Sequence, residues 1–357
     1  MERIPVGILG ATGMVGQQYL RLLADHPWFE ITFLCASPKS AGKTYAEAVQ
    51  ERWHLATPIP NKISRLHVHS IDQIQQAQEC CRLVFSAVSA DLAKEYEERY
   101  AEAGLPVVSN ASYHRTTVDV PVLIPEINAA HLAILPQQQS KRGWSKGFIV
   151  TKPNCSIQSY MLPLAPLHET FGIKNLLITT LQAISGAGYP GVSSWDIYDN
   201  VIPYIAKEEE KTETEPLKIF GKLQNNQIVS ASGICVSAHC NRVPVLDGHL
   251  ACVSVEFKTK PALEQVLAIW SSYVSLPQQL QLPSAPAQTI IYKEEVNRPQ
   301  PRLDRDAGKG MAVTVGRLRP CNLLDLRFVA LSHNTQRGAA GGGILNAEIL
   351  VRQGYLT

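Results

Sequence analysis

The sequence predicts an α/β protein with two parts: an N-terminal doubly wound parallel sheet and a following α+β region. Three observations lead to this prediction. Up to residue 109, apolar strands alternate with helices, which is the order found in helix-covered parallel sheets. After residue 150 the alternation gives way to strands joined by short turns. The length of 357 residues also exceeds what one ordinary core accommodates.

The composition narrows the class of protein. The formal net charge is +2, with 18% charged and 45% hydrophobic residues, and this balance disfavours a nucleic-acid-binding protein. No apolar run of about eighteen residues suggests a membrane span. Residues 1–6 lack the layout of a secretory signal, and the eight cysteines are scattered. We therefore expect reduced thiols and a cytoplasmic location.

The first element is a strand over residues 4–9, followed by a glycine-rich turn and a helix over 15–24. Glycines let the backbone approach a pyrophosphate, and a helix N-terminus attracts it. This strand–turn–helix unit is Rossmann-like and predicts a bound dinucleotide. The alternative is a glycine-rich turn in an unrelated α/β fold. The turn residues expected to contact the cofactor are Gly10, Thr12, Gly13, Met14 and Val15.

The second strand, over residues 31–36, predicts which dinucleotide is used. NAD-binding domains usually place a carboxylate at the end of this strand, to bind the ribose hydroxyls. Here residues 37–43 supply hydroxyls and lysines, and Glu30 precedes the strand. This loop favours a 2′-phosphate and hence NADP, unless it is only a solvated polar loop.

Two further strands, over residues 83–88 and 105–109, flank a helix over 90–103. Ligands of such sheets bind beyond the carboxyl ends of the strands, where small polar residues follow both strands here. Arg115 comes shortly after the second of these ends and is a candidate for holding an anion. Taken by itself, it is better explained as an ordinary surface arginine.

Cys155 lies between a strand end at 147–150 and a helix predicted over 156–168. Pro153 disfavours helix before the cysteine, and Asn154 is a good N-cap. Cys155 is therefore predicted in the first helical turn, where the helix dipole should lower the pKa of its thiol. That makes it a candidate nucleophile, with a merely buried, packed cysteine as the alternative.

The second half contains a strand over 176–182 that runs into a glycine-rich turn over 185–191. Residues 208–215 form a charged run that fits a solvated helix face.

Strands over 234–245 and 250–257, joined through Asp247-Gly248, predict a β-hairpin flanked by Arg242 and His249. A glycine-rich stretch over 338–343 opens a C-terminal helix, which we expect to pack on the first part.

Five cysteine and histidine side chains around the Asp247-Gly248 turn could suggest a zinc site. Their spacing fits no common zinc pattern, so no metal is predicted. They are Cys235, His239, Cys240, His249 and Cys252.

A nicotinamide-binding domain combined with an activated cysteine indicates aldehyde oxidation through a thioester. The cysteine attacks the aldehyde, the hemithioacetal loses hydride to the cofactor, and the acyl group passes to an acceptor. A histidine suits the accompanying proton transfers.

Over nearly its whole length the chain also resembles the aspartate-semialdehyde dehydrogenases of the archaeal and fungal branch. The motifs that together carry this resemblance are residues 7–16, Pro153-Asn154-Cys155-Ser156, residues 181–188, Glu208-Glu209-Glu210-Lys211, Asn241-Arg242-Val243-Pro244-Val245 with His249, and residues 331–335.

The resemblance implies a role for each matching residue. The catalytic group comprises the nucleophile Cys155, the acid/base His249 and the substrate-orienting Gln182. Arg242 would bind the substrate α-carboxylate and Glu208 its ammonium group. The implied phosphate ligands are Lys211, Arg115 and Asn154. Ser37 and Ser40 would face the 2′-phosphate of NADP and Asn334 the nicotinamide amide, and the remaining implied cofactor contacts are Ser86, Ser185 and Gly186.

The implied architecture is an NADP-binding domain over 1–150, completed by a C-terminal helix over 336–357, and a catalytic and dimerisation domain over 151–335. The protein would form a homodimer or homotetramer. It would reduce L-aspartyl 4-phosphate to L-aspartate 4-semialdehyde with NADPH, reversibly, in the biosynthesis of lysine, threonine, methionine and isoleucine.

Malonyl-CoA reductases resemble the same branch and are the main alternative, and N-acetylglutamyl-phosphate reductases share the plan more distantly. Glu208, a partner for a free amine, argues against both. A non-catalytic cofactor-binding regulator is a further alternative, against which stands the joint presence of Cys155, Gln182, Arg242 and His249.

Overall fold

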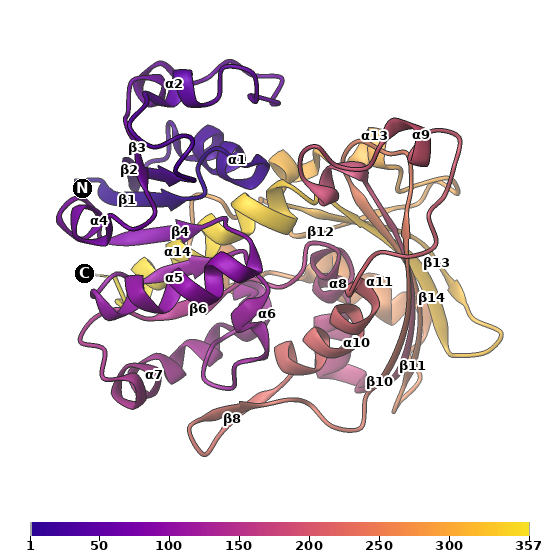
Figure 1. Ribbon diagram of the computed structural model, residues 1–357. Coiled ribbons are helices and arrows are strands. Elements are labelled where there is room, and N and C mark those ends of the chain that lie inside the picture. The colour runs from indigo at the N-terminus through magenta and orange to yellow at the C-terminus, as the bar shows by residue number, and fades with distance from the viewer. Residues whose placement is uncertain (1, 357) are drawn as a thin grey trace.

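The computed structural model describes residues 2–356, which form two six-stranded sheets placed side by side (Figure 1). In the first sheet every pairing is parallel and the strand order is β3-β2-β1-β4-β5-β6. The order reverses direction at β1, so the predicted doubly wound sheet is confirmed. Its strands are β1 (Ile4–Leu9), β2 (Phe29–Ala36), β3 (Val68–Ser70), β4 (Leu83–Ser86), β5 (Val107–Ser109) and β6 (Ile149–Thr151).

Helices link the strands of this sheet. The predicted helices after β1 and β4 are present, starting at Met14 and Ala90. The helices are α1 (Met14–Leu23), α2 (Tyr45–Ala48), α3 (Asn61–Ser64), α4 (Ile74–Cys80), α5 (Ala90–Glu102), α6 (Pro125–Asn128) and α7 (Leu135–Arg142), and the short 3-10 helix η1 spans Tyr113–Thr116.

The second sheet is mixed, with three antiparallel and two parallel pairings in the order β10-β7-β11-β14-β13-β12. The predicted hairpin is wrong, because β7 lies between the two strands that the turn connects. The β10–β11 connection instead crosses over the end of β7. The strands are β7 (Ile173–Gln182), β10 (Cys235–Arg242), β11 (His249–Phe257), β12 (Ile290–Lys293), β13 (Val313–Pro320) and β14 (Leu326–Ser332), while β8 (Lys222–Gln224) and β9 (Gln227–Val229) form a separate ribbon.

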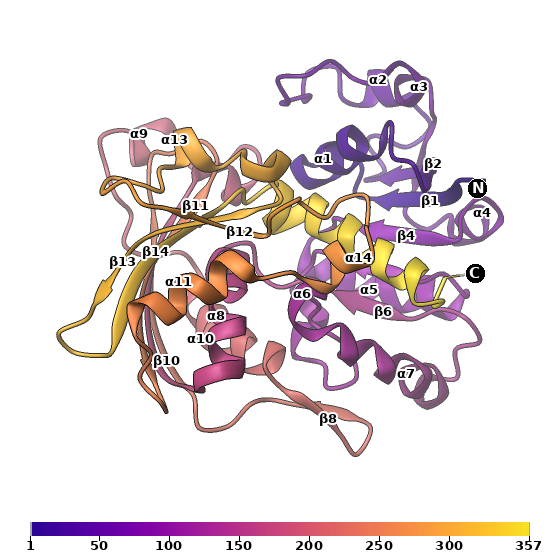
Figure 2. The same ribbon diagram turned by 180° about the vertical axis from the view of Figure 1, so that it is seen from behind.

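Helices α8 (Ile157–Phe171), α10 (Glu208–Ile219) and α11 (Leu263–Ser272) lie between the second sheet and the first (Figures 1 and 2). Alternate residues of β11 from His249 to Phe257 are buried on this face. The outer face of the sheet carries no helix in residues 2–356, and Leu177 and Cys252 are exposed. The remaining short helices are α9 (Ser194–Ile197), α12 (Leu276–Gln279) and α13 (Pro301–Asp304).

The C-terminal helix α14 (Gly341–Arg352) returns to the first sheet, as Figure 2 shows. Its residues Ile344, Leu345 and Ile349 belong to the same buried cluster as Val6 and Leu20 of the first sheet and its helix α1. A π-helical turn, η5 (Gln336–Ala340), precedes α14 and links it to the end of β14. This turn brings the end of the chain past the junction of the two sheets. Within residues 2–356, no helix has the length and apolar character that crossing a membrane requires.

Candidate active site

A cleft of about 620 Å³ opens where the carboxyl ends of the first sheet face the second sheet. It joins residues beside the glycine-rich turn to Cys155 and to the loop after β7. Those that line it include Met14, Val15, Ala87, Val88, Ser89, Asn110, Arg115, Lys152, Asn154, Cys155, Ser185, Gly186, Tyr189, Asn334, Thr335 and Gly338.

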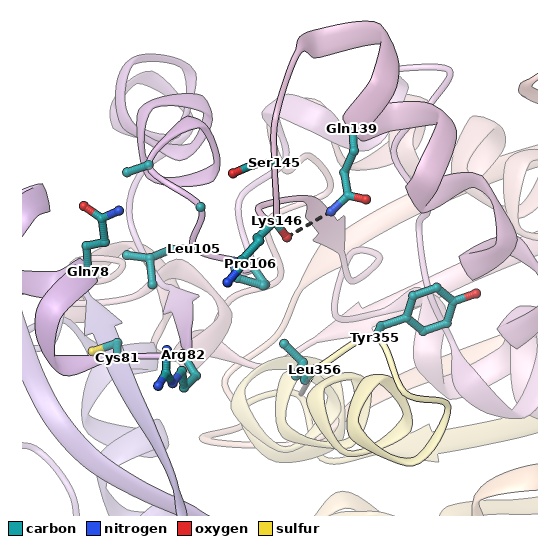
Figure 3. Close-up of a pocket in the computed structure, with 12 residues that line it drawn as sticks. Gln78, Cys81, Arg82, Leu105, Pro106, Gln139, Ser145, Lys146, Tyr355 and Leu356 are labelled. Carbon is teal, nitrogen blue, oxygen red and sulfur yellow. Dashed lines mark hydrogen bonds between the residues drawn. The ribbon is translucent and has the colours of Figure 1, made fainter.

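A second hollow, of about 610 Å³, lies at the opposite, amino ends of β4 and β5 (Figure 3). Arg82, Gln139 and Lys146 contribute to its lining, and Gln139 Nε2 donates to the Lys146 carbonyl at 2.9 Å. Ligands of doubly wound sheets bind at the carboxyl ends, so we assign the active site to the first cleft.

The turn after β1 has the shape that a dinucleotide requires. Gly10 has a φ of +80°, and a Cβ there would lie 2.7 Å from the Ala87 carbonyl oxygen. A Cβ at Gly16 would lie 2.3 Å from the Gly10 carbonyl oxygen, so the helix can approach the turn only with glycine at this position. No side chain caps the N-terminus of α1 at Gly13, which leaves backbone N–H groups for a pyrophosphate.

The loop after β2 differs from the prediction at one residue. Ser37 is exposed, whereas Ser40 is fully buried, and its Oγ accepts a hydrogen bond from Arg52 Nη2 at 3.1 Å. Ser40 is therefore not placed to contact a phosphate directly. The exposed Arg52 supplies a cation at this position, which the sequence prediction did not include. Ser86 is also fully buried, so the cleft surface beside β4 is formed by its successors from Ala87 onward.

Cys155 lies in the turn between β6 and α8, and the helix begins one residue later than predicted, at Ile157. Asn154 still organises this start, because its Oδ1 accepts from the backbone N–H and the hydroxyl of Ser156 at 3.0 and 2.8 Å. Gly338 packs against the cysteine, since a Cβ there would lie 2.9 Å from Cys155 Cβ. Cys155 is thus held between the Asn154–Ser156 turn that precedes α8 and the backbone at Gly338.

The prediction of a lowered thiol pKa is wrong for the structure as it stands. Burial raises the pKa of Cys155, and the nearby Glu208 carboxylate raises it further. The charges of Lys152, Arg115 and Arg242 act in the opposite direction without cancelling the effect of burial. A helix dipole acts only within its first turn, and Cys155 precedes that turn.

Glu208, at the start of α10, gathers three of the predicted site residues. Its carboxylate accepts hydrogen bonds from Asn154 Nδ2 at 2.9 Å, Gln182 Nε2 at 3.1 Å and Lys211 Nζ at 2.8 Å. Burial raises the pKa of Glu208, but Lys211 and the two amides outweigh it and leave the pKa lowered. The charged run therefore begins with a buried, ionised carboxylate and is not wholly a solvated face.

Arg115 and Glu215 form a second buried pair. Arg115 Nη1 donates to Glu215 Oε1 at 2.9 Å, and both side chains are about 7% exposed. The other carboxylate oxygen, Oε2, accepts the backbone N–H of Asn154 at 2.7 Å. Glu215 therefore links Arg115 to Asn154, the residue before Cys155, a connection that the sequence prediction missed.

Gln182, Arg242 and His249 come together where the neighbouring strands β7 and β10 end and β11 begins. Arg242 pairs with Gln182 across β10 and β7, and β11 begins beside them at His249. All three side chains point to the helix-covered face and are at most 6% exposed. Gly186 covers them, because a Cβ there would lie 2.8 Å from Arg242 Nη1 and 3.0 Å from His249 Nε2.

His249 is held in one orientation. Its Nδ1 accepts the backbone N–H of Ala183 at 3.0 Å, so the neutral ring carries its proton on Nε2. Nε2 is buried and has no hydrogen-bond partner within residues 2–356. Burial, with help from the charges of Arg242 and His333, lowers the pKa of His249 to about 3. The ring is therefore a neutral donor at ordinary pH.

Asn334 connects the loop after β7 with the turn before β11. Its Oδ1 accepts from the Gly248 backbone N–H and its Nδ2 donates to Ser185 Oγ, both at 2.8 Å. It lines the cleft beside Ser185, so a nicotinamide amide would meet a side chain that is already oriented. No sequence motif would have revealed this three-way contact, because its members are far apart along the chain.

Family models place the chain among known proteins. Residues 5–135 match the model described as semialdehyde dehydrogenase, NAD binding domain, and residues 164–337 match semialdehyde dehydrogenase, dimerisation domain. The chain belongs to the semialdehyde dehydrogenase family. These two matches place the glycine-rich turn in the family's NAD-binding domain, and Gln182, Arg242 and His249 in its dimerisation domain.

Members of this family resemble the chain over nearly its full length. Aspartate-semialdehyde dehydrogenase of Archaeoglobus fulgidus is 47% identical over 351 residues, covering 98% of this chain and 99% of the relative. The enzyme of Schizosaccharomyces pombe is 46% identical over 358 residues, covering 98% of this chain and 99% of the relative. The crystal structure of the Candida albicans enzyme with NADP superposes with a TM-score of 0.91 at 44% identity, covering 99% of this chain and 100% of the other.

Proposed function

We propose that this protein is an NADP-dependent aspartate-semialdehyde dehydrogenase. It converts L-aspartyl 4-phosphate into L-aspartate 4-semialdehyde and phosphate, reversibly, through a thioester on Cys155. The observation that carries the proposal is the meeting of Gln182, Arg242 and His249 at one sheet edge, in a chain of this family whose cleft contains Cys155. The malonyl-CoA alternative has no support among the relatives.

The reductive direction begins when the Cys155 thiolate attacks the acyl carbon of aspartyl phosphate. The carbon–oxygen bond to the phosphate breaks, phosphate leaves, and a thioester remains on Cys155. The free donors of Arg242 fit the substrate α-carboxylate, and Glu208 fits its ammonium group. Lys211, Arg115 and Asn154 are our proposed phosphate ligands, which must exchange part of their present contacts with Glu208 and Glu215 for the phosphate oxygens.

NADPH, when bound, supplies the hydride that reduces the thioester carbon. His249 serves this step through its Nε2–H group, which can donate to the carbonyl oxygen as negative charge develops there. Because the Ala183 N–H fixes the tautomer, His249 needs no reorientation before it donates. Cys155 then leaves as a thiolate and the semialdehyde is released.

The cofactor contacts follow the shape of the cleft. Backbone groups around Gly10, Thr12 and Gly13 and the start of α1 at Met14 and Val15 would hold the pyrophosphate. Ser185, Gly186 and Asn334 would meet the nicotinamide end. Ser37 and Arg52 would bind the 2′-phosphate, with Ser40 holding Arg52 in place.

Assembly and location complete the proposal. We propose a homodimer, or a homotetramer built from such dimers, with the division into domains near residue 150 and a cytoplasmic enzyme. The uncovered outer face of the second sheet supports self-association. So do the exposed aromatic side chains of Trp195 and Tyr198, which are 92% and 82% accessible.

One assay tests the function. Purified protein is given aspartate semialdehyde, phosphate and NADP, and formation of NADPH is followed by absorbance. Turnover should require phosphate, and kcat/KM should be higher with NADP than with NAD. Equal or better use of NAD would contradict the cofactor assignment. Turnover of malonyl-CoA with NADPH, without turnover of the semialdehyde, would contradict the substrate.

Arg52→Gln refines the cofactor test. It should raise KM for NADP while leaving KM for NAD unchanged, because only NADP carries the 2′-phosphate. The exposed Arg82→Gln, at the opposite hollow, is the matched control and should change neither value.

A further inference from the structure

Lys152 is a buried lysine in the active-site cleft to which the reaction as described above assigns no role. It follows β6 directly, and its backbone N–H donates to the Ser109 carbonyl at 3.0 Å, which fixes it at the carboxyl edge of the sheet. Its side chain is 2% exposed, and it lines the same cleft as Cys155. Lysines are rarely buried without a partner, so this position calls for an anion.

The ammonium group of Lys152 has unused hydrogen-bonding capacity. Its Nζ donates to one acceptor, the carbonyl of the next residue Pro153, and it forms no ion pair with any carboxylate of residues 2–356. Lys218, the other strongly buried lysine, donates to the carbonyls of Arg115 and Thr117 at 2.7 Å each. Burial and, to a smaller extent, the neighbouring Arg115 lower the pKa of Lys152, while Cys155, Glu215 and Glu208 raise it, and the net result is a pKa of about 7.

Cys155, in turn, lacks a hydrogen-bond donor or a paired cation for its sulfur in the part of the chain that the structure describes. Among residues 2–356 no donor forms a hydrogen bond with its Sγ, and burial together with Glu208 disfavours the thiolate. Three cations face it. Arg115 is already paired with Glu215, and Arg242 donates to the Ala183 carbonyl and is expected to bind the substrate carboxylate. Neither Lys152 nor Arg242 has a carboxylate partner in the described chain. Because Arg242 is expected to bind the substrate carboxylate, Lys152 is the cation that remains for the thiolate.

We propose that Lys152 is a positioning residue for the nucleophile, whose ammonium group is the counter-charge that holds Cys155 as a thiolate in the cleft. The thiolate and the ammonium are then stabilised together, because each removes the cost of burying the other. Glu208 opposes the thiolate, and the ammonium group of a bound substrate would neutralise that effect. This inference rests on the proposed role of Cys155 and adds the residue that sets its charge.

The test measures how fast iodoacetamide alkylates Cys155 as a function of pH, without any substrate. Labelling of the Cys155→Ser variant is subtracted as the background from the other seven cysteines. In Lys152→Met the midpoint of the profile should rise by about one to two pH units, the effect expected from losing an adjacent opposite charge. Lys152→Arg, which keeps the charge, should retain most of the wild-type midpoint.

Lys218→Met is the matched control, since it also removes a buried ammonium, and its midpoint should stay at the wild-type value. Turnover of Lys152→Met should be depressed at pH 7 and recover as the pH is raised, a change that mere destabilisation would not produce. Circular dichroism and NADP binding report whether each variant is folded, and Lys152→Gln replaces Lys152→Met if that variant is not.

An unchanged alkylation midpoint in a folded Lys152→Met or Lys152→Gln variant would overturn the proposal. A Lys218→Met midpoint that moved as far would do the same, by showing that any buried charge suffices. The labelling needs no substrate, whereas the substrate assay with the wild-type protein tests the proposed function. The two can therefore fail independently.

Discussion

Two buried clusters of charged side chains adjoin at residues 337 and 338, and they differ in how fully their donors are used. In the first cluster, Arg337 is 1% exposed and all three of its nitrogens are engaged, by Glu126 at 2.6 and 2.7 Å and by Gln158 at 2.9 Å. The second is the catalytic cleft on the other side of Gly338. There Lys152 has one acceptor, and His249 Nε2 has none within the described chain.

This difference distinguishes a cluster that stabilises the fold from one that can bind a ligand. A buried ion pair with every hydrogen bond satisfied holds its segments in place and has nothing left for a ligand. Arg337 fixes the turn η5, so that Gly338 rests against Cys155. Buried donors without partners cost stability and are tolerated where a ligand will satisfy them.

Cys155→Ser should abolish turnover while leaving NADP binding intact. A serine hydroxyl at neutral pH is a far poorer nucleophile than a thiolate, whereas the glycine-rich turn is untouched. Steady-state turnover and a fluorescence titration with NADP measure the two properties. Substantial activity in the serine variant would exclude covalent catalysis by this residue, and bound substrate should slow alkylation of the wild-type cysteine.

His249→Asn should lower kcat by roughly 10²–10⁴ with little change in KM for the semialdehyde or NADP, because the donor acts mainly in the transition state. Burial lowers the pKa of His249, so the ring is already neutral above the lowered value of about 3. Its ionisation therefore adds no step to the activity profile between about pH 5 and pH 8. A profile whose step in that range vanished in the variant would show that His249 titrates there instead.

Arg337→Met should destabilise the protein by about 3–5 kcal/mol, since it leaves the Glu126 carboxylate buried without a partner. Chemical denaturation followed by circular dichroism measures the loss. The double variant Arg337→Met, Glu126→Met should recover much of it, because no uncompensated charge remains. A double variant as unstable as the single one would mean that the pair does more than satisfy its own charges.

Arg242→Lys should raise KM for the semialdehyde by about 10- to 100-fold, with a smaller fall in kcat from misplaced substrate. Lysine keeps the charge but loses the planar fork that matches a carboxylate. KM for NADP should stay nearly constant and serves as the internal control. An unaltered KM for the semialdehyde would remove the carboxylate-binding role from Arg242.

Local patterns were enough to predict much of the fold. The glycine-rich turn and the alternation of strands and helices predicted the parallel sheet, because spacing within a few residues reflects the period of each element. Cys155, Gln182, Arg242 and His249 were all named from the sequence, and the structure places the last three together. The resemblance to a family supplied the roles that residue spacing could not.

The errors arose where distant segments meet. The turn at Asp247-Gly248 predicts a hairpin by its own chemistry, but β7 is inserted between the two strands by a pairing that begins some sixty residues earlier. The dipole argument for Cys155 was local as well, and burial together with Glu208 outweighed it. Ser40 was expected at a phosphate, yet packing placed it beneath Arg52.

Short-range sequence therefore decided which elements form, because period, caps and turns act over a few bonds. Tertiary structure decided the charge states and the free donors. Whether a thiol or an ammonium is stabilised depends on burial and on charges brought from other parts of the chain. Lys152 illustrates this, because it stands three residues from Cys155 in the sequence and only the structure shows that it is buried in the same cleft.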